Sequence, residues 1–239
     1  MKHSLSIMIL LMLGVSQNQT HAQSVDPAEV LQSVLAKQDQ IMDYQVNIEI
    51  ELDVDFINMP VKHAVMYYKR PHKIKYTSDE FIMLPKKGMH FSLRNILKDD
   101  FTSIFTGYEY IDQRRHYTIK VIPAKKKSAI VLATIWVDAA SLVISKVENN
   151  TRSEGSYILD FTYGQESELL PAMIKIAFEM EDFNIPLKFI GKPIKSGDKK
   201  LKQKGKKTGI VYIRFSGYKI NSDLSDDIFE QEPEIWTPK

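Results

Sequence analysis

Hydrophobic residues along most of this chain alternate with polar ones, which is the period-two pattern of β-strands. The clearest case is segment 44–56, where apolar side chains alternate with Asn, Glu and Asp. The apolar positions of this segment are Val46, Ile48, Ile50, Leu52, Val54 and Phe56. One face of the strand is therefore apolar and the other acidic, which is typical of an antiparallel sheet with one solvated face.

Further strands are predicted at close spacing, mostly separated by short polar turns. They are 61–69, 73–77, 108–111, 116–122, 129–138, 142–148, 155–163, 172–182 and 209–220. Many short strands that follow one another in this way predict a meandering antiparallel sheet that curls and uses helices as a cover. The fold class expected from the pattern is therefore mainly β with some α.

Two segments show helical spacing. In the first, Asp26 suits an N-cap and Pro27 the first helical position. The apolar residues that then recur at helical spacing are Val30, Leu31, Val34, Leu35, Ile41 and Met42. The second segment, 92–98, places Leu93, Ile96 and Leu97 on one side of a short helix. We expect each helix to turn its apolar side toward the core.

The residues Lys69-Arg70-Pro71 interrupt the strand pattern. Proline has no backbone N–H and tends to end a ladder of strand hydrogen bonds, so we predict that one strand ends at Lys69 and Arg70. The chain then turns into the next strand, 73–77. The residue before a proline is held in an extended conformation, which fixes the place of Arg70.

The N-terminus has the pattern of a secretory signal peptide. A cationic start, Met1-Lys2-His3, precedes an apolar run over 5–15 and a polar stretch that ends in Ala22. The apolar run is shorter than the ~20 residues of a membrane-spanning helix. We therefore expect cleavage of residues 1–22 and a soluble mature protein that forms one domain over 23–239. No cysteine follows the expected cleavage site, so no thiol is available there for a lipid.

The net charge of +2 points to no class of partner, and nothing predicts nucleic-acid binding. Lysines nevertheless gather within 188–207, and we expect this Lys-rich segment to be an exposed, mobile loop. The lysines are Lys188, Lys192, Lys195, Lys199, Lys200, Lys202, Lys204, Lys206 and Lys207. They serve either solubility or docking to an anionic membrane surface or an acidic protein partner.

The chain contains no motif for a metal or for catalysis. There is no cysteine, and the histidines His63, His72, His90 and His116 are too far apart in sequence for a local metal motif. We therefore expect no cofactor and no enzyme. An uncharacterised hydrolase stays as an alternative if a Ser, a His and a carboxylate converge in the fold. The segment 149–151 (Asn-Asn-Thr) is interpreted as a turn after a strand.

Three parts of the chain together resemble the LolA-like family, which carries and sorts outer-membrane lipoproteins in the Gram-negative periplasm. The first is 66–75, with its Lys-Arg-Pro between hydrophobic residues. The second pairs 117–123 with the Thr-Ile-Trp-Val-Asp of 134–138. The third is 215–221, a strand that ends in Tyr-Lys-Ile-Asn, with the acidic turn 224–229 closed by Phe. Their order and spacing span most of the expected mature chain.

The resemblance implies a half-open barrel, in which the two helices cover the concave apolar face of an unclosed sheet. It also implies a periplasmic, non-enzymatic carrier that shields the acyl chains of lipidated proteins or lipids. The candidate cavity residues are Val46, Ile48, Ile50, Leu52, Val54, Phe56, Val65, Tyr67 and Trp136. For the second strand, Met66 and Tyr68 are the alternative to Val65 and Tyr67, because a one-residue slip reverses the faces.

The resemblance also assigns a role to Arg70. In the family, the arginine of this motif hydrogen-bonds to the covering helix and holds the empty cavity closed. A guanidinium suits this task because its five donors can reach several carbonyl groups at once. The alternative is that Arg70 is only a solvated strand end. For the whole protein, the alternative function is an envelope-stress sensing or regulatory interaction module of the same fold.

Overall fold

A computed structural model describes 25–54, 60–78, 82–85, 93–97, 100–125, 128–152, 155–182, 187–190 and 204–230. The predicted signal peptide and Phe56 lie outside these described residues, and so does the middle of the Lys-rich segment, 191–203. In the part that is described, no helix is long and apolar enough to cross a membrane.

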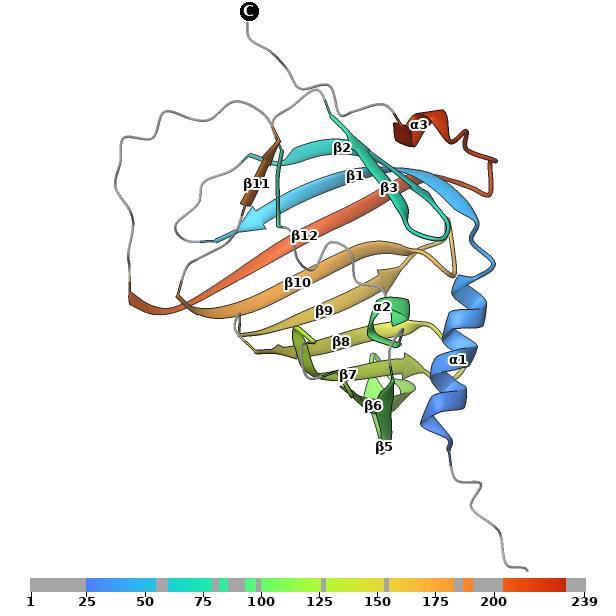
Figure 1. The fold of residues 1–239 in the computed structure, drawn as a ribbon, viewed down its shortest axis with the longest axis vertical. Coiled ribbons are helices and arrows are strands. Elements are labelled where there is room, and N and C mark those ends of the chain that lie inside the picture. The colour runs from blue at the N-terminus through green and yellow to red at the C-terminus, as the bar shows by residue number, and fades with distance from the viewer. Residues whose placement is uncertain are drawn as a thin grey trace, which may run out of the picture.

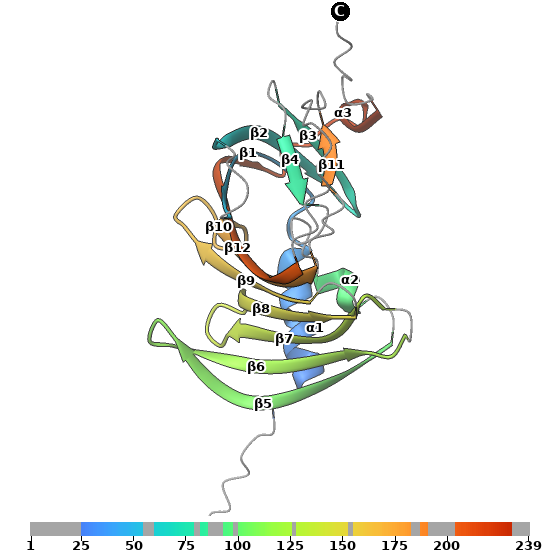
Figure 2. The same cartoon turned by 90° about the vertical axis from the view of Figure 1, so that its left-hand side faces the viewer.

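Ten strands form one antiparallel sheet in the order β3-β2-β1-β12-β10-β9-β8-β7-β6-β5 (Figure 1). The strands are β1 (Asp43–Asp53), β2 (Lys62–Lys69), β3 (Lys73–Thr77), β5 (Phe101–Ile111), β6 (Arg114–Pro123), β7 (Ile130–Asp138), β8 (Ile144–Thr151), β9 (Ser156–Tyr163), β10 (Pro171–Asp182) and β12 (Lys204–Ile220). The edge strands β3 and β5 do not pair, so the sheet is curled but unclosed, as Figure 2 shows. The predicted half-open barrel is confirmed.

The two predicted helices are present, and Figures 1 and 2 show both of them on the concave side of the sheet. Helix α1 (Pro27–Gln38) begins after Asp26, whose Oδ1 accepts a hydrogen bond of 2.8 Å from Ala28 N. Helix α2 (Leu93–Leu97) buries Leu93 and Ile96. A third helix, α3 (Asp227–Glu230), was not predicted.

One detail of the first helix differs from the sequence pattern. The helix ends at Gln38 with Asp39 as its C-cap, so Ile41 and Met42 belong to the connection to β1. Ile41 is buried, whereas Met42 is 52% exposed. The helical spacing of Met42 is therefore accidental, because the helix ends four residues before it.

The core is built from rows of apolar side chains that cross the concave face of the sheet. Strand pairing aligns one such row from β5 to β1: Phe105, Ile119, Ile135, Val147, Leu159, Ile176, Val211 and Leu52. Leu31 and Val34 of α1 and Leu93 of α2 pack into the same core. Each fully buried side chain of this size contributes about 1.5–3 kcal/mol, so the helices are held mainly by this apolar contact.

Several local predictions are wrong. A separate pair of strands, β4 (Ile82–Pro85) and β11 (Leu187–Ile190), was not predicted. The Lys-rich segment 188–207 is not a loop at its ends, because it overlaps β11 and the beginning of β12. The segment 149–151 forms the end of β8 and not a turn. In each case a strand partner overrides weak local propensity.

Candidate functional site: an apolar cavity under helix α1

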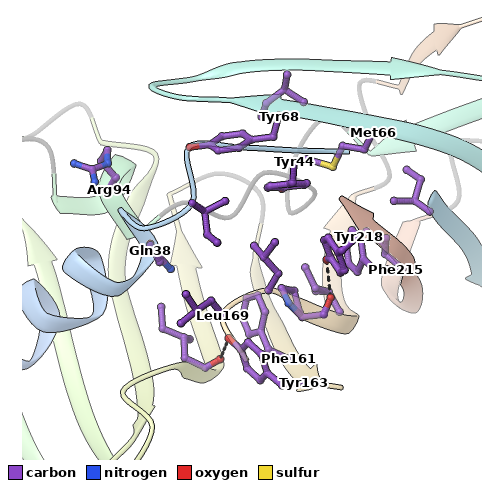
Figure 3. Close-up of a pocket in the computed structure, with 18 of the residues that line it drawn as sticks. Gln38, Tyr44, Met66, Tyr68, Arg94, Phe161, Tyr163, Leu169, Phe215 and Tyr218 are labelled. Carbon is purple, nitrogen blue, oxygen red and sulfur yellow. Dashed lines mark hydrogen bonds between the residues drawn. The ribbon is translucent and has the colours of Figure 1, made fainter. Parts of the chain in front are cut away.

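A cavity of about 270 Å³ lies between the end of α1 and the concave face of the sheet (Figure 3). Its size is just below the roughly 300–1,000 Å³ of typical small-molecule sites. Much of the wall is aromatic, and the rings come from β1, β2, β9 and β12. They belong to Tyr44, Tyr68, Phe161, Tyr163, Phe215 and Tyr218, and Tyr76 of β3 adds a further ring.

A β-bulge explains why β12 contributes two aromatic rings to this wall. In a regular strand, residues 215 and 218 point to opposite faces. The register between β1 and β12 shifts between Gln45 and Asn47, and Gly217 has a φ of +67°. This left-handed conformation suits glycine, because a side chain there costs about 1–2 kcal/mol. The extra residue returns Tyr218 to the concave face, beside Phe215.

The hydroxyl groups of two wall tyrosines are satisfied by the backbone. The Tyr163 hydroxyl donates to Ile144 O at 2.8 Å, and the Tyr218 hydroxyl donates to Pro171 O at 2.7 Å (Figure 3). Burial raises the pKa of both phenols above the ordinary value, so they stay neutral. Tyr44 stacks on Tyr68 with ring centroids 5.1 Å apart. The aromatic part of the wall is therefore uncharged, and the hydroxyl groups of Tyr163 and Tyr218 are paired.

Charged side chains stand at the rim of the cavity instead. Arg70 Nη1 donates to Asp39 O at the end of α1 at 2.7 Å, and Arg70 Nη2 lies 3.3 Å from Asp39 Oδ1. Arg94 of α2 pairs with the same carboxylate. This rim cluster (Asp39, Arg70 and Arg94) joins the end of β2, the end of α1 and α2. Its side chains are 31–48% exposed, and exposed ion pairs contribute only about 0–1 kcal/mol.

The structure places the predicted cavity residues of β1 on the expected face. Ile48 lines the cavity. Val46, Ile50 and Val54 are buried along the same face, and Leu52 packs against the core. Phe56 lies outside the described residues. The alternation of this one strand was therefore enough to identify its inner face.

The choice of Val65 and Tyr67 in the second strand is wrong. Strand pairing sets Met66 opposite Val46 and Tyr68 opposite Tyr44, so the even-numbered residues of β2 face the cavity. Both Met66 and Tyr68 line it. The sequence left this choice open because both faces of the strand carry large side chains, and only the pairing with β1 decides between them.

The prediction for Trp136 is also wrong. Its neighbours Ile135 and Val137 belong to the core of the concave face, so the alternation of β7 directs Trp136 to the convex face. There its ring lies 4.8 Å from the Lys146 ammonium. A buried Trp is easily mistaken for a residue of the inner face when the pairing of its strand is unknown.

Sequence reasoning missed most of the wall and two members of the rim. Phe161, Tyr163, Phe215 and Tyr218 were predicted only as strand residues, although the two-residue spacing of Phe161 and Tyr163 could have marked a common wall. Nothing in the sequence pairs Asp39 with Arg94, because the two residues meet only after α1 and α2 have packed on the sheet.

A Ser, a His and an Asp do converge on the convex face. His116 Nδ1 lies 2.8 Å from Arg114 O, and Nε2 lies 2.8 Å from Ser145 Oγ. Asp138 Oδ2 lies 3.8 Å from Nε2 as well, whereas a catalytic triad places the carboxylate at the other ring nitrogen. His116 is only 2% exposed. We therefore assign these residues, the His116 cluster, a structural role.

The described residues contain no group of three or more His, Cys, Asp or Glu side chains that could hold a metal ion. The apolar cavity offers a different kind of site. Its walls offer burial for hydrocarbon, and its rim offers charged groups that link two helices to one strand end.

Several solved structures are similar to this protein in fold. A domain from Vibrio parahaemolyticus, provisionally described as an outer membrane lipoprotein-sorting protein domain, has a TM-score of 0.57 and 14% identity and matches over 84% of this chain and 94% of its own. A DUF1329 family protein from Desulfovibrio piger has a TM-score of 0.53 and 14% identity over 86% and 98%. A LolA superfamily protein from Nitrosomonas europaea has a TM-score of 0.48 and 15% identity over 86% and 98%.

No protein-family model and no curated relative matches the chain. At these identities, the structural likeness shows the fold alone. The chain shares its fold with the Vibrio lipoprotein-sorting domain and the Desulfovibrio protein, which agrees with the fold that the three sequence motifs implied.

Proposed function

We propose that this protein is a periplasmic, non-enzymatic carrier that binds the acyl chains of lipidated proteins or lipids in its half-open barrel. The observation that carries the proposal is the aromatic cavity beneath α1, whose rim is closed by half-exposed ion pairs. Each methylene group buried contributes about 0.8 kcal/mol, so an acyl chain that crosses water needs such a cover. The predicted signal peptide and the lipoprotein-sorting fold of the Vibrio domain support export and this class of cargo.

The rim cluster suits a cover that opens and closes. Arg70 binds the terminal carbonyl of α1, and Arg94 brings α2 to the same carboxylate. Because these side chains are partly solvated, breaking their contacts costs little, whereas burying an acyl chain in the space they close is favourable. A ligand that binds only the open form would shift the population toward it.

Delivery also needs a contact with a membrane or a partner. In this proposal the lysines of 188–207 approach anionic lipid headgroups or an acidic protein surface. Such a contact weakens as salt is added, because screening shortens the reach of surface charges. If the lysines serve solubility alone, salt has no effect on binding to anionic vesicles.

Native mass spectrometry of the protein purified from a bacterial periplasm tests the proposal. We expect mass additions that match lipid or lipid-linked fragments. In a titration with a fluorescent acyl probe, Leu169→Trp should weaken binding because its larger side chain fills the cavity that Leu169 lines. The matched control, Val131→Trp, changes a residue outside the cavity that is 41% exposed, and it should bind the probe normally. A protein that carries no lipid and binds no acyl probe contradicts the proposal.

A further inference from the structure

Asn149 on β8 is a buried amide without hydrogen-bond partners. Within the described part of the chain, its Oδ1 and Nδ2 atoms are buried and unpaired, and the residue is 0% exposed. Asn149 pairs with Ala133 of β7 and with Tyr157 of β9. It stands two residues after Val147 on β8. Since Ala133 and Val147 are core residues of the concave face, Asn149 lies on that face too.

Nearby polar groups are satisfied, which sets Asn149 apart. The adjacent Asn150 accepts a hydrogen bond from Ser156 at 2.7 Å, and the cavity tyrosines Tyr163 and Tyr218 donate to backbone carbonyls. A buried polar group without partners destabilises a fold, and in native proteins such a group calls for an explanation such as water, strain or function. An apolar residue of the same size at this position would make the folded state more stable, because it has no polar group to leave unpaired.

The chemistry of the side chain limits what can satisfy it. A carboxamide presents a donor and an acceptor together, so its best partner is a group that also presents both. A secondary amide does so, whereas an ester presents acceptors alone and hydrocarbon presents neither. Among acylated molecules, Asn149 therefore favours those with an amide-linked chain.

The distance to the cavity is compatible with one ligand that reaches both places. Phe161 lines the cavity, and Tyr157, the partner of Asn149, stands four residues earlier on β9, which corresponds to about 13 Å along the strand. A long acyl chain spans this distance. Leu159 lies between them and is a fully buried core residue of the concave face, so the ligand has to displace core packing to reach Asn149.

We propose that Asn149 is a specificity-determining residue that hydrogen-bonds the amide linkage of an acylated ligand inside the half-open barrel. This inference rests on the proposed carrier function and names the chemical class of its cargo. The amide is kept unpaired in the empty protein and gains both partners when the ligand enters. The protein thus gives up some stability in the empty state in exchange for selectivity.

Two fluorescent probes with the same palmitoyl chain, one joined by a secondary amide and one by an ester, test this role. The wild-type protein should bind the amide about tenfold more tightly, which corresponds to one or two good hydrogen bonds. Asn149→Leu should lose the preference for the amide and unfold at a higher urea concentration than the wild type. Asn149→Ala serves as a second variant if the leucine does not fit.

The matched control is Thr134→Val, which removes a buried hydroxyl from the neighbouring strand β7, one residue from Ala133 and therefore on the convex face. It should keep the preference for the amide. Equal binding of the two probes by the wild type, or an unchanged preference in the folded Asn149 variants, overturns the inference and leaves the carrier function standing. If the wild type binds neither probe, the carrier function fails and the inference fails with it.

Discussion

Two polar clusters on opposite faces of the sheet are built in different ways. On the convex face, the side chains of His116 and Asp138 are 2% and 3% exposed and meet hydrogen-bonding groups on several sides. At the rim of the cavity, Arg70 and Asp39 are 31% and 38% exposed, and Arg94 is 48% exposed. The first cluster is enclosed by strands, and the second joins the two helices α1 and α2 to the end of one strand.

In the proposed carrier, this difference lets one sheet serve both as a frame and as the wall of a site that opens. Buried polar groups that are fully paired hold strand ends in place, because removing one partner leaves the others unsatisfied. Half-exposed ion pairs contribute little, because water replaces them at low cost. Substitutions in the two clusters should therefore separate stability from access to the cavity.

The largest effect is expected at Asp138. Its Oδ1 accepts from Ala140 N at 2.9 Å and from Ser141 N at 2.7 Å, and its Oδ2 lies 2.7 Å from Arg114 Nε. Asp138→Ala leaves these donors without an acceptor and should lower the free energy of unfolding by about 3 kcal/mol in urea titrations. Asp53→Ala, at an exposed position of β1, is the control and should stay within about 0.5 kcal/mol of the wild type.

The same carboxylate should make stability sensitive to acid. Burial favours its neutral form, but hydrogen bonds from Ser141 and Ala140 and the charge of Arg114 prevail and hold the pKa of Asp138 below its ordinary value. Its contribution is therefore complete above the unfolded pKa of about 3.9 and is lost as the pH falls through the lower pKa of the folded state. Unfolding measured in this range should show a shallower decline for Asp138→Asn than for the wild type. Parallel curves would assign the acid sensitivity to other carboxylates.

An intermediate effect is expected where the backbone itself shapes the cavity. Gly217 has a left-handed φ, and an added Cβ would lie 3.0 Å from Asn47 Nδ2. Gly217→Ala should therefore cost about 1–2 kcal/mol and weaken binding of an acyl probe by disturbing Tyr218. The neighbouring Ser216→Ala is the control and should change neither quantity. Unaltered stability of Gly217→Ala would show that the bulge tolerates a side chain.

The smallest effect on stability is expected at Arg70. Arg70→Leu should lower the free energy of unfolding by at most about 1 kcal/mol, because its ion pair is partly solvated. The same change can raise the population of the open form, and with it the binding of a hydrophobic dye, by up to about fivefold. Arg152→Leu removes an equal charge from an exposed position outside the cavity wall and is the control. Equal dye binding and cargo release by Arg70→Leu and the wild type would assign Arg70 to a solvated strand end.

The sequence alone was enough for helices α1 and α2 and for most strands of the large sheet. The alternation in 44–56 identified the inner face of β1, the Asp26 cap identified the start of α1, and Pro71 marked the end of β2. These features depend on neighbours a few residues away, which is why periodicity and capping preferences can predict them. The resemblance carried by the three motifs then predicted that the sheet is unclosed.

Only the tertiary structure decided which residues form the site. The pairing of β1 with β2 chose Met66 and Tyr68 over Val65 and Tyr67, and the bulge at Gly217 brought Tyr218 to the wall. The meeting of Asp39 with Arg70 and Arg94, and the isolation of the Asn149 amide, follow from packing between distant segments. A strand pattern repeats every two residues and fits either face equally well, so the contacts across the sheet settle what the local sequence leaves open.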